Sequence, residues 1–301
     1  MANATHEVTA TIPRRSGGIS VTSRRSFTWL GVVPFFLFVG IFLLLPSIWL
    51  AVGAFQTDAG GLTMQYVREA SQGQYLDAYV TSIKLSAITA LTGGIFGLFV
   101  AYAAVKEGSP SWIRALLTTF SGVAANFAGV PLAFAFIATL GSTGLVTVFL
   151  AGHGITLYSG NITSSFAGLV LTYTYFQLPL MILIISPSLD GLRRHWREAA
   201  TNLGATTLQF WLWVGLPILW PALLGAMVLL FGNAFSAYAT AVALTGGTIN
   251  LVPIIIGNVL NGNLVSDPQF GDALALGMIV VIGVSVTIYG LLQRRSARWL
   301  R

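Results

Sequence analysis

Long stretches without a charged residue dominate the pattern along the chain. Lys, Arg, Asp and Glu are all absent from residues 26–57, 85–105, 115–189, 199–266 and 273–293. Each stretch exceeds the length of about 18 residues that indicates a membrane-spanning helix. The third and fourth are too long for one crossing, because a helix rises about 1.5 Å per residue and the hydrocarbon layer is about 30 Å thick. Each of these two stretches must therefore contain a break.

Glycine and small polar residues mark the breaks. Gly141–Gly144 and residues 151–161 divide the third stretch into two spans, over 113–140 and 164–189. In the fourth stretch, residues 199–215 contain too many Thr, Asn and Gln side chains to cross, which leaves a single span. That fifth span covers residues 217–244.

The pattern predicts an all-α integral membrane protein with six transmembrane helices over residues 26–293. Residues 1–25 form a polar tail and residues 294–301 a basic tail. The apolar segment Leu251–Leu260 is too short to cross, so we expect a helix at the outer surface or packed on the outer mouth.

Composition excludes several classes of protein. The chain is 55% hydrophobic and only 8% charged, whereas about a quarter of the residues in soluble domains are charged. The net charge of +6 does not indicate a nucleic-acid partner, because the basic residues are scattered at the ends of apolar runs. Cysteine is absent and the three histidines, His6, His153 and His195, are far apart, which argues against a metal centre.

The distribution of basic residues predicts the orientation. Apart from Arg68 and Lys84, every basic residue precedes the first span, follows the last, or lies between spans two and three or four and five. The positive-inside rule then places both termini in the cytoplasm. The first apolar run is longer than the core of a signal peptide, so we interpret residues 1–25 as a cytoplasmic tail before an uncleaved anchor.

The predicted spans lack the buried ionisable side chains that most ion-coupled carriers need, and the chain lacks the loop with which many enzymes bind ATP. Apart from Lys84 and Arg114, both near span ends, the spans contain no acidic, basic or histidine side chain, whereas ion-coupled carriers generally hold carboxylates or histidines within the membrane. No phosphate-binding Gly-x4-Gly-Lys-Ser/Thr loop occurs, so ATP would have to be bound by another subunit. We therefore expect a non-catalytic chain without a cofactor of its own.

A few neutral polar residues lie deep in the predicted spans, and they have two interpretations. They line a solute path, or they tie helices together by hydrogen bonds. For each residue singly the second interpretation is favoured. The candidates for the path are Asn126, Tyr173, Gln177 and Asn233.

The longest predicted cytoplasmic loop, residues 190–216, contains the most informative pattern. Asp190 is a candidate cap for a first short helix, and Gly204 suits the left-handed residue that would end it. Thr206 and Gln209 have the spacing of a capping box that starts a second helix. Ala199 and Ala200 leave a shallow surface, and Glu198 places a carboxylate beside it, which suits docking on a soluble partner.

This loop resembles the EAA motif of permease subunits in binding-protein-dependent ABC importers. The motif is Glu-Ala-Ala, three residues, Gly, nine residues, an Ile-like residue, one residue and Leu-Pro. The chain matches it with Val in place of Ile, and the resemblance extends over residues 27–293. The matching residues are Glu198, Ala199, Ala200, Gly204, Val214, Leu216 and Pro217.

The resemblance implies the type I ABC importer permease fold and the family's arrangement of partners. The loop would be a coupling helix in a groove of a separate ATPase subunit, with Glu198 facing basic residues and Gly204 making the turn. Ala199 and Ala200 would pack closely, and Leu216-Pro217 would join the loop to the fifth span. A second permease subunit and an external solute-binding protein would complete the assembly in a bacterial cytoplasmic membrane.

The substrate is predicted less directly. Residues 231–247 look most like permeases of the group that includes spermidine/putrescine, iron, thiamine, sulfate and phosphonate systems, and a polyamine is the best single expectation. A six-span secondary carrier or channel is the alternative, followed by a membrane scaffold without transport.

Overall fold

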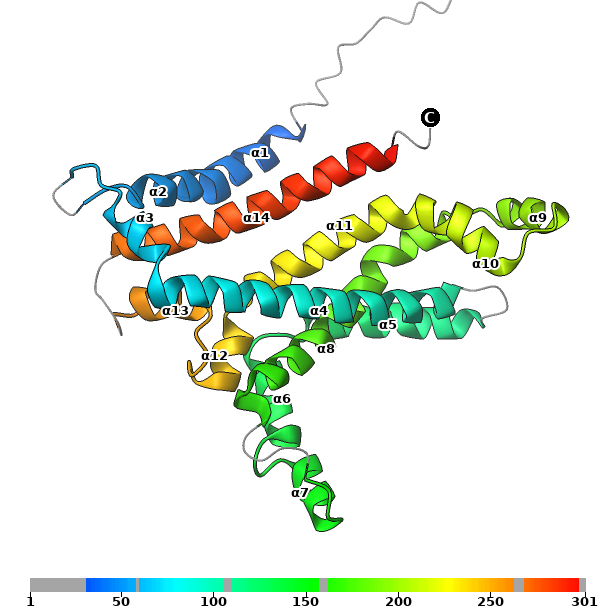
Figure 1. Ribbon diagram of the computed structural model, residues 1–301, viewed down its shortest axis with the longest axis horizontal. Helices are drawn as coiled ribbons and strands as arrows, with labels where there is room; N and C mark the ends of the chain where they lie inside the picture. The colour runs from blue at the N-terminus through cyan, green and yellow to red at the C-terminus, as the bar shows by residue number, and fades with distance from the viewer. Residues whose placement is uncertain (1–30, 58–59, 106–109, 157–161, 263–267, 298–301) are drawn as a thin grey trace, which may run out of the picture. The chain divides into compact units, whose positions relative to one another are not determined.

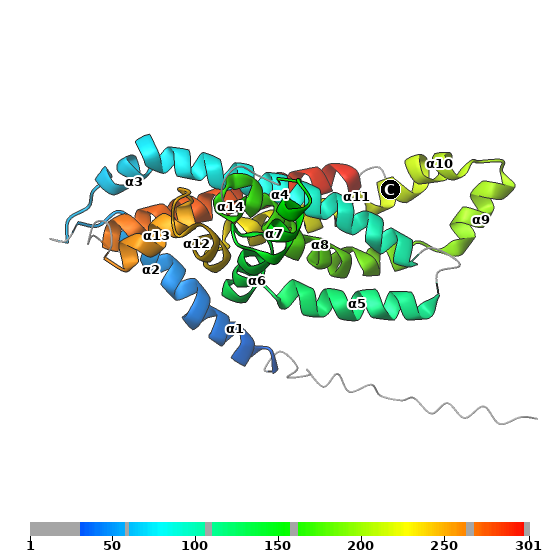
Figure 2. The ribbon, with the colours of Figure 1, turned by 90° about the horizontal axis from the view of Figure 1, so that it is seen from below.

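The computed structural model describes residues 31–57, 60–105, 110–156, 162–262 and 268–297, and these form helices joined by short loops (Figure 1, Figure 2). The predicted tail at residues 1–25 lies outside the described residues, as do residues 298–301 of the basic tail. The chain divides into two compact units, residues 1–48 and 49–301. Each is described separately.

The described part of the first unit is one apolar helix with a widened turn. Helix α1 (Val33–Val39) leads into the π-helical turn η2 (Gly40–Leu44) and then into α2 (Leu45–Gly53), which ends in the second unit. The widened turn lies just before Pro46. A proline ring clashes with the carbonyl four residues earlier, and here Leu45 donates instead to the carbonyl of Gly40, five residues back.

The second unit contains the other helices. In chain order they are α3 (Gln65–Ala70), α4 (Gly73–Val105), α5 (Ser111–Asn126), α6 (Val130–Leu140), α7 (Leu145–Gly152), η3 (Ile162–Ser164), α8 (Phe166–Asp190), α9 (Arg194–Asn202), α10 (Thr207–Phe210), η4 (Trp211–Gly215), α11 (Leu216–Phe235), α12 (Ala239–Thr245), α13 (Val252–Leu260) and α14 (Pro268–Ala297).

Six helical segments in the described part of the chain are long and apolar enough to cross a membrane, which confirms the predicted number of spans. Several bounds differ from the prediction. The second segment begins at Gly73, so Lys84 lies well inside a 33-residue helix and not near its outer end, and its side chain is exposed. The six segments are Val33–Gly53, Gly73–Val105, Val130–Gly152, Phe166–Asp190, Thr207–Phe235 and Pro268–Arg294.

The prediction of one continuous span over residues 113–140 is wrong. Helix α5 ends at Asn126 and α6 starts at Val130, after Gly129, whose φ of 76° is left-handed. The amide of Gly129 donates to the Thr240 hydroxyl at 2.9 Å, which replaces the helical hydrogen bond lost at the break. The segment long enough to cross is α6 with α7, and the predicted break at Gly141–Gly144 is a short turn within it.

The predicted fifth span, 217–244, is shifted. The helix begins at Thr207 and continues through η4 into α11, which ends at Phe235. Residues 239–245 form the separate helix α12. Between α11 and α12, the Tyr173 hydroxyl donates to the carbonyl of Ala237 at 2.8 Å, so a contact from α8 stabilises this second break.

Helix α4 packs along α8 and α11, and glycines set the close approach of α4 to α8 (Figure 1). A Cβ atom on Gly93 would lie 2.5 Å from the Cβ of Gln177, and one on Gly97 would lie 2.7 Å from the carbonyl oxygen of Leu178. Small residues spaced four apart allow such contacts between membrane helices. Gly93 and Gly97 therefore allow α4 and α8 to pack in close contact.

The short apolar segment predicted at residues 251–260 is helix α13. Its first residues, Val252, Pro253 and Ile254, are buried, so it packs against the protein core. The amide of Val252 donates to the buried hydroxyl of Ser82 on α4 at 3.0 Å, which satisfies one of the unpaired groups at a helix start.

We expect Gly97→Ala to destabilise the protein by about 1–3 kcal/mol, because the added methyl group would displace the α8 backbone. The matched control is Gly122→Ala on α5, where an added Cβ would have no atom within 4 Å. The measurement is the apparent melting temperature of each variant in detergent. Equal melting temperatures for the two variants would contradict the packing described for α4 and α8.

Candidate functional site

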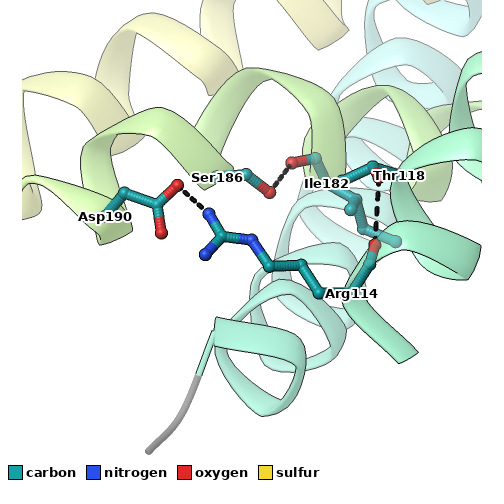
Figure 3. Close-up of polar contacts among 5 residues, drawn as sticks. All are labelled: Arg114, Thr118, Ile182, Ser186 and Asp190. Carbon is teal, nitrogen blue, oxygen red and sulfur yellow. Dashed lines mark hydrogen bonds and ion pairs between the residues drawn. The ribbon is translucent and has the colours of Figure 1, made fainter. Parts of the chain in front are cut away.

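The predicted loop at residues 190–216 forms two short helices that meet at a glycine, as the sequence indicates. Helix α9 begins after Arg193, whose side chain makes no capping hydrogen bond. The prediction that Asp190 caps this helix is wrong, because Asp190 is the last residue of α8 and forms an ion pair with Arg114 of α5 (Figure 3). The carboxylate therefore connects the end of α8 with α5.

Gly204 makes the turn between α9 and α10. Its φ is 81°, its amide donates to the carbonyl of Thr201 at 2.9 Å, and the amide of Ala205 donates to the carbonyl of Ala200 at 2.9 Å. These two hydrogen bonds with a left-handed glycine define a Schellman motif, in which a residue with a Cβ is strained. The predicted left-handed role of Gly204 is confirmed.

The second helix starts with the predicted capping box. The amide of Gln209 donates to the Thr206 hydroxyl at 3.3 Å, and the amide of Thr206 donates to the Gln209 side-chain oxygen at 2.8 Å. Helix α10 then continues into the π-helical turn η4, where Leu216 donates to the carbonyl of Trp211. Pro217 follows, so this widened turn precedes a Leu-Pro pair in the same way as η2 does.

An aromatic contact anchors the end of the loop to the membrane helices. The Trp211 ring packs edge-on against the Tyr102 ring of α4, with the centroids 4.9 Å apart. Phe210 is buried, and a Cβ on Gly215 would lie 2.6 Å from the Trp211 ring. Side-chain packing of Trp211 therefore connects the end of the loop to α4.

The matched residues of the motif occupy different parts of the loop surface. Glu198 and Ala199 are exposed on α9, and Leu216 and Pro217 are exposed at the start of α11. Ala200 is half-buried and lines, with Gly204, a groove of about 360 Å³ between the two short helices. The other residues that line the groove are Leu203, Ala205, Gln209, Phe210, Trp213 and Val214.

Two apolar side chains at the groove were not identified from the sequence. Leu203 is 88% exposed and Trp213 is 80% exposed. Large apolar side chains exposed together at a groove mark interaction surfaces more often than isolated ones do. The EAA motif contains neither residue, so the motif could not identify them. Their position on either side of Gly204 was the signal in the sequence that could have done so.

Three of the four candidate path residues lie together. Gln177 is fully buried on α8, where its amide donates to the carbonyl of Leu230 at 2.5 Å and its oxygen accepts from the Asn233 amide at 3.3 Å. Tyr173, one turn earlier on α8, makes the contact to Ala237 described above. These hydrogen bonds tie α8 to α11 and its following turn, and a role in a solute path remains a prediction.

Asn126 is separate from this group. Its side chain is exposed at the end of α5, and its amide donates to the carbonyl of Gly122 on the same helix at 2.8 Å. A separate polar contact, between α4 and α8, joins the hydroxyls of Thr92 and Thr174 at 2.9 Å. Asn126 thus lies next to the break before α6, where it makes a local contact.

No protein-family model matches the chain. Among known proteins, it is 28% identical over 252 residues to a probable sulfate transport system permease protein cysT of Nephroselmis olivacea, covering 81% of the chain and 83% of that protein. It is 28% identical to the sulfate transport system permease protein CysT of Salmonella typhimurium, covering 76% and 79%. The spermidine/putrescine permease PotB of Haemophilus influenzae is 26% identical over 50% of the chain and 52% of its own length.

The fold matches solved ABC importers. A bacterial alginate ABC transporter, solved in complex with a periplasmic protein that holds an alginate pentasaccharide, has a chain of TM-score 0.73 and 19% identity, covering 89% of this chain and 94% of that one. The chain has the fold of an ABC importer permease. A second alginate transporter structure gives a TM-score of 0.70 at 18% identity, with 89% and 95% covered.

The comparisons support the coarse prediction of an ABC importer permease and correct the finer one. The sulfate permeases match a larger share of this chain than PotB does. The spermidine/putrescine subgroup expected from residues 231–247 is therefore not the best-supported subtype, and the six-span secondary carrier is not favoured. Residues 231–247 alone did not distinguish the sulfate permeases from the spermidine/putrescine permeases, because the group expected from these residues includes both.

We expect Gly204→Val to loosen the α9–α10 turn, because a residue with a Cβ in the left-handed region costs about 1–2 kcal/mol. Gly204→Asn is the matched control, since asparagine is tolerated in this conformation. The measurement is the rate of tryptic cleavage after Arg193 and Arg197 in inside-out membrane vesicles. A faster rate for Gly204→Val than for Gly204→Asn and wild type is expected, and equal rates would contradict the role of the turn.

Proposed function

We propose that this chain is the permease subunit of an ATP-driven importer and that it couples to a separate ATPase subunit through residues 190–216. The observation that supports this most directly is the geometry of the loop. The Schellman turn at Gly204 fixes α9 against α10, exposes Glu198 and Ala199, and leaves a groove beside them. A preorganised surface of this kind binds with less loss of conformational entropy than a flexible loop.

The roles of the site residues follow from this placement. Glu198 offers its carboxylate to basic side chains of the ATPase, and Ala199 and Ala200 allow close approach. Leu203 and Trp213, both exposed, supply apolar contact area at the edge of the groove. Leu216 and Pro217 join the surface to α11, and ATP is bound by the partner subunit, so the chain itself requires no cofactor.

The coupling step is a rigid-body transmission. Closure of the ATPase subunits on ATP shifts the loop, provided that they contact it differently in the open and closed states. Because α10, η4 and α11 are continuous, and Trp211 packs on Tyr102, the shift reaches the membrane helices without an intervening flexible segment. The pathway then opens outward and accepts cargo from an external binding protein.

We propose sulfate, or a closely similar tetrahedral oxyanion, as the substrate. The relatives named as sulfate permeases support this choice. The charges agree with it, because the carboxylates within the described membrane segments lie only near helix ends, at Asp77, Asp190 and Asp272. A polyamine would meet no carboxylate deeper in the pathway, whereas neutral amide and hydroxyl groups can donate hydrogen bonds to an anion.

The proposed assembly contains two permease subunits, two ATPase subunits and an external solute-binding protein. The second permease is either a copy of this chain or a related one. The multi-pass membrane protein is placed in a bacterial cytoplasmic membrane, where a periplasmic or external binding protein can reach the outer helices α3 and α13.

We expect Glu198→Ala to weaken the binding of the ATPase subunit by about tenfold or more, because the change leaves its basic partners unpaired. The measurement is the amount of ATPase that co-purifies with the tagged permease in mild detergent. Glu69→Ala on α3, predicted to lie on the opposite side of the membrane, is the matched control. Equal recovery of ATPase with both variants would refute the docking role of Glu198.

Transport tests the substrate. We expect ATP-dependent uptake of radiolabelled sulfate by proteoliposomes that contain the permease with the ATPase and binding protein that co-purify with it. A tenfold excess of unlabelled spermidine should leave this uptake unchanged. ATP-dependent uptake of labelled spermidine in place of sulfate would overturn the proposed substrate while retaining the permease function.

A further inference from the structure

The Arg114–Asp190 ion pair lies where the coupling loop leaves the membrane helices. Arg114 is in the first turn of α5, and Asp190 is the last residue of α8 (Figure 3). Within the described ranges it is the one ion pair that the structure contains. Only Gly191, Leu192 and Arg193 separate Asp190 from α9. The position of the carboxylate therefore limits where α9 can begin.

Two hydroxyl groups near the ion pair make hydrogen bonds within their own helices. The Thr118 hydroxyl donates to the carbonyl of Arg114 at 3.0 Å, and the Ser186 hydroxyl donates to the carbonyl of Ile182 at 2.5 Å (Figure 3). Both hydroxyls bond to their own helices, so neither competes for the guanidinium or the carboxylate. The Arg193 side chain lies over the Trp196 ring, 5.9 Å from its centroid, and points its charge elsewhere.

The pair is partly exposed, with the Arg114 side chain 46% and the Asp190 side chain 38% accessible. Ion pairs with this exposure contribute little to folding stability. The Arg114–Asp190 ion pair instead constrains geometry, because it fixes α5 to the end of α8, and α8 packs along α5. A variant without the pair should therefore still fold, which makes the role of the contact accessible to experiment.

The loop thus has a different attachment at each end. The end at α10 is held by the apolar contact of Trp211 with Tyr102, and the start before α9 is held by the ion pair. Helix α5, which the ion pair attaches to the loop, ends at the candidate path residue Asn126 and the break before α6. Without the pair, α9 could shift without moving α5.

We propose that Arg114 and Asp190 are positioning residues that fix α9 relative to α5, so that movement of the coupling loop is transmitted to α5 as well as to α11. The inference rests on the proposed function for its consequence in transport. The fixed geometry itself can be measured without any substrate.

The test of geometry uses the absence of native cysteine. Spin labels are attached at Thr119→Cys on α5 and His195→Cys on α9, two exposed positions, in the full chain in lipid nanodiscs. Double electron–electron resonance should give a narrow distribution of the distance between the two spin labels in the otherwise wild-type chain. Arg114→Gln and Asp190→Asn should each broaden it, whereas the exchange Arg114→Asp with Asp190→Arg should restore it. Arg294→Gln, which removes a positive charge from the end of α14, is the matched control.

The outcomes decide the proposal. Unchanged distributions in both single variants would overturn it. Broadening that the charge exchange fails to reverse would also overturn it, because the effect would then come from the individual side chains and not from their pairing. Broadening in Arg294→Gln to the same extent would show a general effect of charge and would likewise overturn it.

Transport in the assembled complex supplies the functional readout. Sulfate taken up per ATP hydrolysed should fall about threefold in Arg114→Gln and Asp190→Asn, the scale of one exposed ion pair, and recover in the charge exchange. ATPase recovery in co-purification should stay at the wild-type level in all variants. If the wild-type complex takes up no sulfate, the proposed substrate fails, and the distance measurement still decides whether the ion pair positions α9.

Discussion

Hydrocarbon offers no hydrogen-bond partner, so every interruption of a membrane helix in this protein needs a donor or acceptor from elsewhere in the chain. Three interruptions meet this requirement through side chains distant in sequence. Thr240 accepts from the amide of Gly129, Tyr173 donates to the carbonyl of Ala237, and Ser82 accepts from the amide of Val252. These contacts join the start of α6 to α12, the turn before α12 to α8, and α13 to α4. The second unit is therefore held together at the places where its helices break.

Close packing of α4 with α8 brings those side chains within reach. Gly93 and Gly97 allow the α8 backbone to approach α4 so closely that a single added methyl group would overlap it. On α8, Gln177 donates to the carbonyl of Leu230 on α11, and α4, α8 and α11 all pack against one another. Tyr173 and Gln177 are therefore structural ties in this conformation, whatever further part they take in a solute path.

The proposed coupling surface depends on that packing. A loop that binds an ATPase can move membrane helices only when its two ends are firmly attached to them. Here α10 continues through η4 into α11, and Trp211 packs on Tyr102, while Asp190 ties the other end to α5. The widened turn before Pro217 accommodates the proline without breaking the helix. Motion at α9 and α10 can thus reach helices on either side of the loop.

The sequence by itself determined the class of fold, the number of spans, the turn at Gly204 and the capping box at Thr206, because charge-free length, left-handed glycine and capping are local properties. Only the tertiary structure decided where α5 and α11 end, since those ends rely on Thr240 and Tyr173, which come from other helices. It also decided that Asp190 pairs with Arg114 instead of capping α9. A carboxylate next to a helix start suits either role locally, and the partner that resolves the choice lies 76 residues away in the chain.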